Sequence, residues 1–197
     1  MDATYYVNLA HRADRRTQLE AQLAQLGWPA ERVDAIHVPQ RGALGCAMSH
    51  AVALRRFIAS SARHALVLED DVVFTRDPRP AVARFLADHA EAGWDVLMLA
   101  SNTVAEAPVA GRDYVTRILN AQTTSAYAVS REFAPELLAC FERSAIALQS
   151  EHAHAHCCDI MWKALQPGSR WYCLRPKVAM QRPGFSDIEG RVTCYNV

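Results

Sequence analysis

Several motifs that would assign this chain to a common enzyme class are missing from its sequence. No GxGxxG follows the first predicted strand, no GxxxxGK[ST] occurs anywhere, and there is no GxSxG. These absences disfavour a dinucleotide-binding Rossmann site, a P-loop and a serine nucleophile elbow. No CxxC pair occurs either, and we expect the six cysteines to be mostly reduced thiols.

The chain also lacks an excess of charge and long apolar runs. Its 197 residues include 21 Lys and Arg against 21 Asp and Glu, so the formal net charge is zero. Without a basic block, binding to nucleic acid through phosphate neutralisation is not expected. No apolar run reaches the ~20 residues that span a bilayer, and no secretion signal opens the chain. We therefore expect a cytoplasmic protein with no transmembrane segment; a peripheral position at the inner membrane stays open.

Hydrophobic residues follow strand and helix patterns in alternation through the first half of the chain. The patterns predict strands at residues 4–9, 32–38 and 64–68, and helices at 14–26 and 43–60. Later segments predict helices after Pro78, near 130–148 and at 159–165, strands at 94–99, 114–119, 125–129 and 171–174, a loop at 101–111 and an irregular tail from 176. The alternation favours an α/β fold, with a mostly parallel central sheet flanked by helices, in a single domain over residues 1–197.

The strongest local signal is ALVLEDDVVF, in which an apolar strand runs into Glu69, Asp70 and Asp71. Burying such carboxylates costs on the order of several kcal/mol each unless a cation or a hydrogen-bond donor compensates. Ligands in open α/β sheets bind at this end of the strands. Mg²⁺ and Mn²⁺ prefer oxygen ligands and often bridge a carboxylate to a substrate phosphate. The cluster therefore predicts a metal or ligand site, and a solvated loop is the alternative.

Two further segments carry groups suited to phosphate binding or catalysis. NLAHRADRR places Arg12 and Arg15 directly after the first strand, where arginine side chains and a helix N-terminus favour anions. An ordinary charged helix face is the alternative interpretation. GALGCAMSH carries His50 at the margin of an apolar helix face. A histidine in that position is usually a boundary residue with a satisfied hydrogen bond.

The segment EHAHAHCCD looks like a metal site because it contains His152, His154 and His156. Zinc sites usually have wider and mixed spacing, so we assign these histidines no role. Asp159 ends the segment just before apolar residues, and a helix N-cap is its simplest interpretation. The lone Asp187 in the tail carries little information by itself.

Taken together and in this order, six features resemble glycosyltransferase family 25, the bacterial lipooligosaccharide sugar transferases related to procollagen galactosyltransferases. They are VNLAHRADRR, GALGCAMSH, VLEDDVVF, SAYAVS, Asp159, and Gln181 followed by SDI. The resemblance implies a GT-A-like fold and a place in lipopolysaccharide biosynthesis. It also implies inverting transfer of a hexose, galactose or glucose, from a UDP-sugar with Mn²⁺ or Mg²⁺. Ala10 and Ala43 replace acidic residues of the family pattern.

We predict roles for individual residues from this resemblance and from the acidic cluster. Asp71, Asp70 and Asp187 would hold the metal ion. The nucleotide would be bound by a set drawn from three segments: Asn8, Leu9, Arg12, Arg15, Ser49, Glu69 and Asp70. Asp159 is our first choice for the general base, and His50 is the second.

Three alternatives concern the acceptor and the class of protein. The acceptor would be a saccharide, a lipid-linked saccharide or a peptide. A metal-dependent nucleotidyltransferase or phosphohydrolase could use the same acids and arginines. A degenerate transferase fold kept only for binding is the third possibility, and the alanines at positions 10 and 43 are what drift toward that state would produce.

Overall fold

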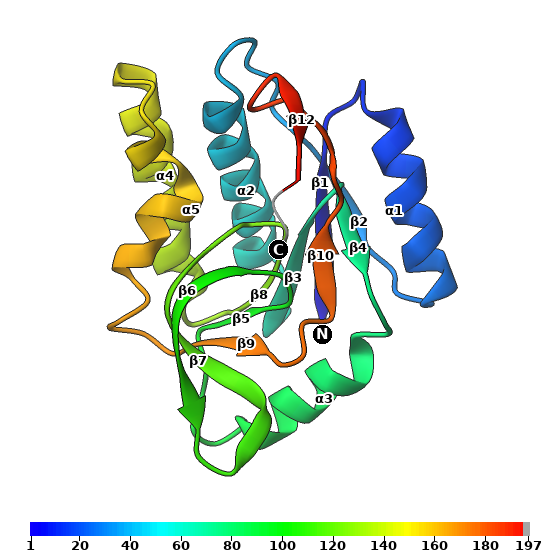
Figure 1. Ribbon diagram of the computed structural model, residues 1–197, viewed down its shortest axis with the longest axis vertical. Coiled ribbons are helices and arrows are strands. Elements are labelled where there is room, and N and C mark those ends of the chain that lie inside the picture. The colour runs from blue at the N-terminus through cyan, green and yellow to red at the C-terminus, as the bar shows by residue number, and fades with distance from the viewer. Residues whose placement is uncertain (195–197) are drawn as a thin grey trace.

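The computed structural model describes residues 1–194 and is built around an eight-stranded sheet of order β2-β1-β3-β8-β5-β9-β7-β6. Its strands are β1 (Ala3–Asn8), β2 (Glu31–Asp34), β3 (His64–Glu69), β5 (Val96–Met98), β6 (Asn102–Val109), β7 (Arg112–Gln122), β8 (Ala126–Ser130) and β9 (Trp171–Leu174). β1 is parallel to β2 and β3, and β5 is parallel to β9. Only β8 and β7 run against these strands. The predicted α/β fold with a mostly parallel sheet is thus confirmed (Figure 1).

Helices cover both faces of the sheet. α1 (Ala13–Gln25) and α3 (Arg79–Asp88) lie on one face, while α2 (Gly42–Ala59) and α4 (Ala134–Ser150) pack together on the other (Figure 1). The short α5 (Cys158–Met161) follows α4, between two 3-10 turns, η1 (His154–His156) and η2 (Trp162–Ala164). Within residues 1–194, no helix combines the length and the apolar character needed to cross a bilayer.

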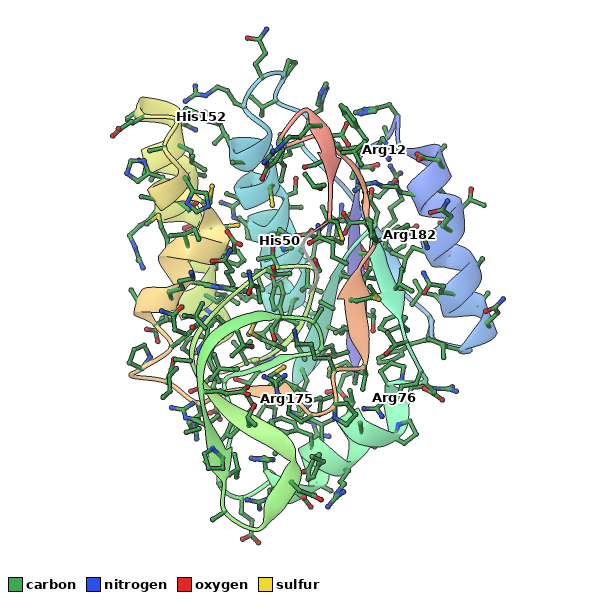
Figure 2. The ribbon with its side chains drawn as sticks, viewed as in Figure 1. Arg12, His50, Arg76, His152, Arg175 and Arg182 are labelled. Carbon is green, nitrogen blue, oxygen red and sulfur yellow. The ribbon has the colours of Figure 1, made fainter. Side chains whose placement is uncertain are left out.

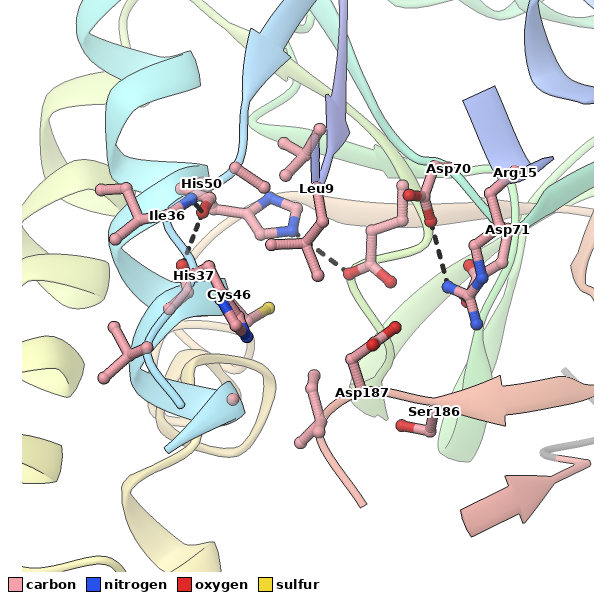
Figure 3. A pocket seen from close by; sticks show the side chains of 18 of the residues that line it. Leu9, Arg15, Ile36, His37, Cys46, His50, Asp70, Asp71, Ser186 and Asp187 are labelled. Carbon is pink, nitrogen blue, oxygen red and sulfur yellow. Dashed lines mark hydrogen bonds and ion pairs between the residues drawn. The ribbon is translucent and has the colours of Figure 1, made fainter. Parts of the chain in front are cut away.

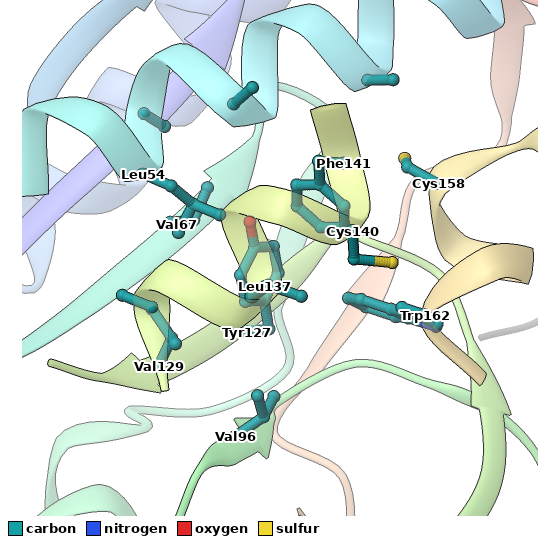
Figure 4. Close-up of a cluster of buried hydrophobic side chains, with 14 of the residues drawn as sticks. Leu54, Val67, Val96, Tyr127, Val129, Leu137, Cys140, Phe141, Cys158 and Trp162 are labelled. Carbon is teal, nitrogen blue, oxygen red and sulfur yellow. The ribbon is translucent and has the colours of Figure 1, made fainter. Parts of the chain in front are cut away.

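Two hydrophobic cores result from this layering, one on each face of the sheet. β3 contributes to both, because successive side chains of a strand point to opposite faces. Leu66 and Leu68 face the core under α1 and α3, whereas Val67 faces the core under α2 and α4. The second core contains large side chains from helices and strands, among them Leu54, Tyr127, Phe141 and Trp162 (Figure 4). Burial on both faces explains why residues 65–68 form a continuous apolar run in the sequence.

The helices and the buried strands agree with the sequence patterns, but the loop predicted at 101–111 is wrong. Residues Asn102–Val109 form β6, which pairs with β7 as a hairpin at the edge of the sheet. Most β6 side chains are exposed or half-exposed, so the strand has no apolar alternation to reveal it. The strand predicted at 32–38 is also shorter, because β2 ends at Asp34 and the chain then leaves the sheet.

The tail from residue 176 is not irregular, as predicted, but contains three short strands. β10 (Ala179–Gln181) pairs with β4 (Val72–Phe74), and β11 (Gly184–Ser186) forms a hairpin with β12 (Arg191–Thr193). Strands of three residues are too short to leave a readable period. The tip of the hairpin lies against the start of α2, where a Cβ added to Gly42 would meet Ile188 Cα at 2.7 Å. The tail is therefore part of the architecture that surrounds the site.

Candidate active site

The candidate site lies where the parallel strands β1, β2 and β3 end. Val7 of β1 is paired with Glu69 of β3, and Asn8 with Asp34 of β2, so the segments that follow these strands meet at one edge of the sheet. A pocket opens there, and the β11–β12 hairpin closes its far side. Side chains from all four segments line it, including Leu9, Arg15, Ile36, Asp70, Asp71 and Asp187 (Figure 3). This is the position at which ligands bind in α/β sheets.

Arg15 and Asn8 neutralise part of the acidic cluster. Arg15 Nη1 donates to Asp70 Oδ1 at 3.0 Å and to Asp71 Oδ2 at 2.9 Å (Figure 3). Asn8 Nδ2 donates to Asp70 Oδ2 at 2.7 Å. Asp70 therefore has a partner for each oxygen, although burial still raises its pKa. The single guanidinium is shared by two carboxylates, which leaves a surplus of negative charge around Asp71.

Asp71 is the member of the cluster with an unused oxygen. Its Oδ1 is buried without a hydrogen-bond partner, while Oδ2 accepts from Arg15 and, at 3.2 Å, from Gln181 Nε2. Burial, followed by the negative charge of Glu69, raises the pKa of Asp71 to about 7. A buried carboxylate oxygen without a donor is costly and calls for a cation or a hydrogen-bond donor from a ligand. Asp70 and Asp187 line the same pocket, but among the described residues these three carboxylates do not lie close enough together to form a ready-made group around one ion.

Asp187 comes from the loop between β11 and β12 and lies in the same pocket as the triplet. It forms an ion pair with Arg12, and His11 Nε2 lies 3.4 Å from its Oδ1. Arg15 Nη2 also donates to the carbonyl of Phe185 at 2.6 Å. Arg12 and the hairpin are adjacent in Figure 2. The arginines that follow β1 thus attach the C-terminal hairpin to the mouth of the pocket.

Glu69 has partners different from those of its two acidic neighbours. Its carboxylate accepts from Thr124 Oγ1 and lies 3.2 Å from His50 Nε2. The other ring nitrogen of His50, Nδ1, lies 3.1 Å from Tyr127 Oη. Although burial by itself lowers the pKa of His50, hydrogen bonds with Cys46 and Glu69 raise it to about 10. His50 is fully buried, and both of its ring nitrogens have partners. This favours the interpretation as a histidine with satisfied hydrogen bonds over a role as general base.

A second pocket adjoins the first, and Cys46, Glu69, Gln181 and Ile188 line both. Asp159 lies in this second pocket. Its Oδ2 accepts from the backbone N–H of Thr123 at 3.2 Å, so its side chain does not cap its own helix. Burial, and secondly the charge of Glu69, raises the pKa of Asp159. An acid with a raised pKa in a pocket beside the first one is placed to exchange a proton with a bound group.

The remaining predicted nucleotide residues, Leu9 and Ser49, both border the first pocket but make different contacts. Leu9 lines the first pocket. Ser49 is buried within α2, where its hydroxyl accepts from the backbone N–H of Ile36 at 2.8 Å and donates to the carbonyl of Gly45. Ser49 therefore fixes the loop after β2, and that loop in turn shapes the pocket wall.

The three histidines of EHAHAHCCD do not gather into a site. His154 lines the second pocket, His156 Nδ1 lies 3.2 Å from the carbonyl of Glu151, and His152 lies beyond the end of α4 (Figure 2). No potential metal cluster among the described residues contains them.

Sequence reasoning missed Cys46 and Thr124 as members of the site. Cys46 lies one helical turn before His50, and the hydrogen bond with Cys158, followed by that with His50, lowers its pKa to about 7 despite burial. The available signal for Cys46 was its i, i+4 spacing from His50 on a predicted helix. Thr124 had no such signal, because it reaches Glu69 only through the pairing of β8 with β3. Cys46, Cys140, Cys157, Cys158 and Cys173 are free thiols.

The fold is shared with solved structures of low sequence identity. One is a glycosyltransferase involved in the glycosylation of the major capsid of PBCV-1, with a TM-score of 0.55, 10% identity and 95% of each chain covered. Another is A197 from STIV, with a TM-score of 0.50, 15% identity, and 100% of this chain and 95% of that chain covered. No family model and no curated protein matches the sequence. The likeness establishes a glycosyltransferase-like fold and does not single out family 25.

Proposed function

We propose that this protein is a metal-dependent glycosyltransferase that moves a hexose, galactose or glucose, from a UDP-sugar to an acceptor hydroxyl with inversion. The observation that carries the proposal is the buried Asp71 Oδ1, which has no hydrogen-bond partner and belongs to a residue that lines the pocket at the strand ends. The glycosyltransferase-like fold supports the class of reaction. The resemblance to family 25 supports the UDP-sugar and the inverting course.

Asp71 would hold the divalent ion, Mn²⁺ or Mg²⁺, together with Asp70 and Asp187. Asp71 Oδ1 has no partner to give up. Asp70 and Asp187 would have to replace contacts that they now make with arginines by contacts with the ion. Held by these residues, such an ion would supply positive charge that stabilises the departing diphosphate. Arg12 and Arg15, which lie beside these acids, would supply further positive charge to the phosphates. Leu9 would border the nucleotide, whereas the buried Asn8 would act by holding Asp70.

Asp159 is the general base of the proposed reaction. It takes the proton of the acceptor hydroxyl while that oxygen forms a bond to the anomeric carbon and the bond from this carbon to the diphosphate breaks. Attack from the face opposite the diphosphate inverts the anomeric centre. The second pocket, which contains Asp159, adjoins the first through Cys46 and Glu69, so donor and acceptor would meet there. His50, our second choice, has both nitrogens engaged, and this favours Asp159.

The acceptor would lie in the second pocket. Its lining is rich in amide and hydroxyl groups, from Asn102, Gln122, Thr123, Thr124 and Ser125. Such groups suit the hydroxyls of a saccharide, free or lipid-linked, better than an apolar peptide side chain.

Product analysis tests the proposed reaction. The full chain is incubated with Mn²⁺ and each of UDP-Gal, UDP-Glc, UDP-GlcNAc and UDP-GalNAc, and the nucleotide products are separated by chromatography. We expect free UDP from UDP-Gal or UDP-Glc, formed by slow donor hydrolysis without acceptor, and none with EDTA. UMP or sugar phosphate in place of UDP would assign the protein to the nucleotidyltransferases or phosphohydrolases. No turnover and no thermal shift with any donor would indicate a non-catalytic module.

A further inference from the structure

A second group of possible metal ligands lies beside the acidic pocket and contains sulfur. Cys46 and His50 follow each other by one turn on the same face of α2, and Glu69 ends the neighbouring strand β3. One ligand atom from each of these three residues lies within 4.8 Å of the other two. In Figure 3, Cys46 and His50 are grouped near α2, apart from Asp70, Asp71 and Arg15.

Neighbouring side chains hydrogen-bond to His50 and Glu69 in the way that residues around a metal site hydrogen-bond to its ligands. A histidine that binds a metal through one nitrogen usually has the other nitrogen hydrogen-bonded, and a ligating carboxylate is usually hydrogen-bonded as well. His50 Nε2 faces Glu69, and Nδ1 lies 3.1 Å from Tyr127 Oη. Thr124 Oγ1 donates to the carboxylate of Glu69. The ring and the carboxylate are thus held in place by residues of the β8 region.

The chemistry of the three ligands differs from that of the acids next to them. Thiolate, imidazole and carboxylate together suit Zn²⁺, whereas Mn²⁺ and Mg²⁺ favour oxygen ligands alone. Cys46 and Glu69 line both pockets, so a fourth coordination position would face the cleft. Three protein ligands with an open fourth position are typical of zinc sites that contact a water or a substrate.

We propose that Cys46, His50 and Glu69 form a zinc site at the junction of the two pockets, separate from the divalent ion of Asp71. The site does not depend on the proposed glycosyl transfer, because it rests on three ligands and their hydrogen-bonded partners alone. Its fourth position faces the cleft, where a water or an oxygen of a bound ligand completes the coordination.

Cobalt substitution tests the site in the absence of any nucleotide or sugar. The reduced full chain, freed of metal with EDTA and exchanged into buffer, is titrated with Co²⁺ and followed by absorbance. We expect one equivalent to produce a sulfur-to-cobalt charge-transfer band that Zn²⁺ abolishes. The band should be lost in Cys46→Ser and His50→Gln. It should persist in Cys157→Ser, a thiol on the wall of the second pocket outside the group, and in Asp71→Asn.

Two further measurements keep the test decisive if the helix variants fold poorly. Tyr127→Phe, which removes an outer partner, should weaken Zn²⁺ binding by about 10–100-fold. In the wild-type chain, Zn²⁺ should slow alkylation of Cys46 by iodoacetamide but not that of Cys157, as read by peptide mass spectrometry. A wild-type titration with no sulfur-to-cobalt band, or equal alkylation of Cys46 with and without Zn²⁺, would overturn the proposal.

Discussion

Replacing Asp71 by asparagine should stabilise the metal-free fold, and the gain should grow with pH. Asp71 is buried among like charges, and its pKa rises from 3.8 to about 7 on folding. Between these values the folded protein keeps a proton that the unfolded chain has released, so this group makes the fold less stable as pH rises through the window. One pKa unit corresponds to about 1.4 kcal/mol. Asparagine is neutral at every pH and avoids this loss.

The size of the effect follows from the same pKa values. The advantage of Asp71→Asn over wild type should increase by about 2–3 kcal/mol between about pH 5 and about pH 8. Urea unfolding in EDTA at both pH values measures it. Asp113→Asn is the matched control, because Asp113 is exposed. This substitution should have little effect on the free energy of unfolding at either pH. A gain for Asp71→Asn that does not vary with pH would refute the idea that uncompensated charge gathers at this carboxylate.

Three more predictions address the base, the cationic group and the pocket wall. Asp159→Asn should reduce turnover by ~10²–10⁴-fold, and wild-type activity should rise with pH as this acid loses its proton; equal rates would remove it from the role. Arg15→Gln should weaken UDP binding by about 10-fold or more in calorimetry, whereas the exposed Arg76→Gln should not. Gly45→Ala places a Cβ 2.3 Å from a backbone oxygen of the loop after β2, and it should lower the free energy of unfolding in urea by about 1–3 kcal/mol. Gly168→Ala, whose Cβ would meet no atom within 4 Å, should change it little.

The buried elements of this fold could be predicted because burial requires apolar residues at regular positions in the sequence. Residues 65–68 are apolar on both faces of the sheet, and residues 43–60 have a helical apolar stripe, so both elements lie close to their predicted places. β6 could not be found in this way, because it is an exposed edge strand. β10 pairs with β4, which is distant in the sequence, and β11 and β12 form a local hairpin, but three residues are too few to show a period in any of these strands.

The site shows the same division between local and long-range information. The carboxylates of residues 69–71 can be recognised in the sequence because they interrupt an apolar segment. The arginines after β1 can be recognised because they directly follow a predicted strand. The contacts that decide their roles are long-range: Arg15 bridges Asp70 and Asp71, and Arg12 holds Asp187 from the tail. Which oxygen stays unpartnered depends on those contacts, and no local pattern encodes it.

The most direct test of the account measures how strongly UDP binding depends on manganese. Calorimetric titration of UDP into the wild-type chain, with Mn²⁺ and with EDTA, should show binding at least about 10-fold tighter with the metal. In Asp71→Ala, the two affinities should be the same, since the open carboxylate oxygen is gone. An equal gain from Mn²⁺ in wild type and in Asp71→Ala would contradict the central claim that this side chain holds the ion of the donor.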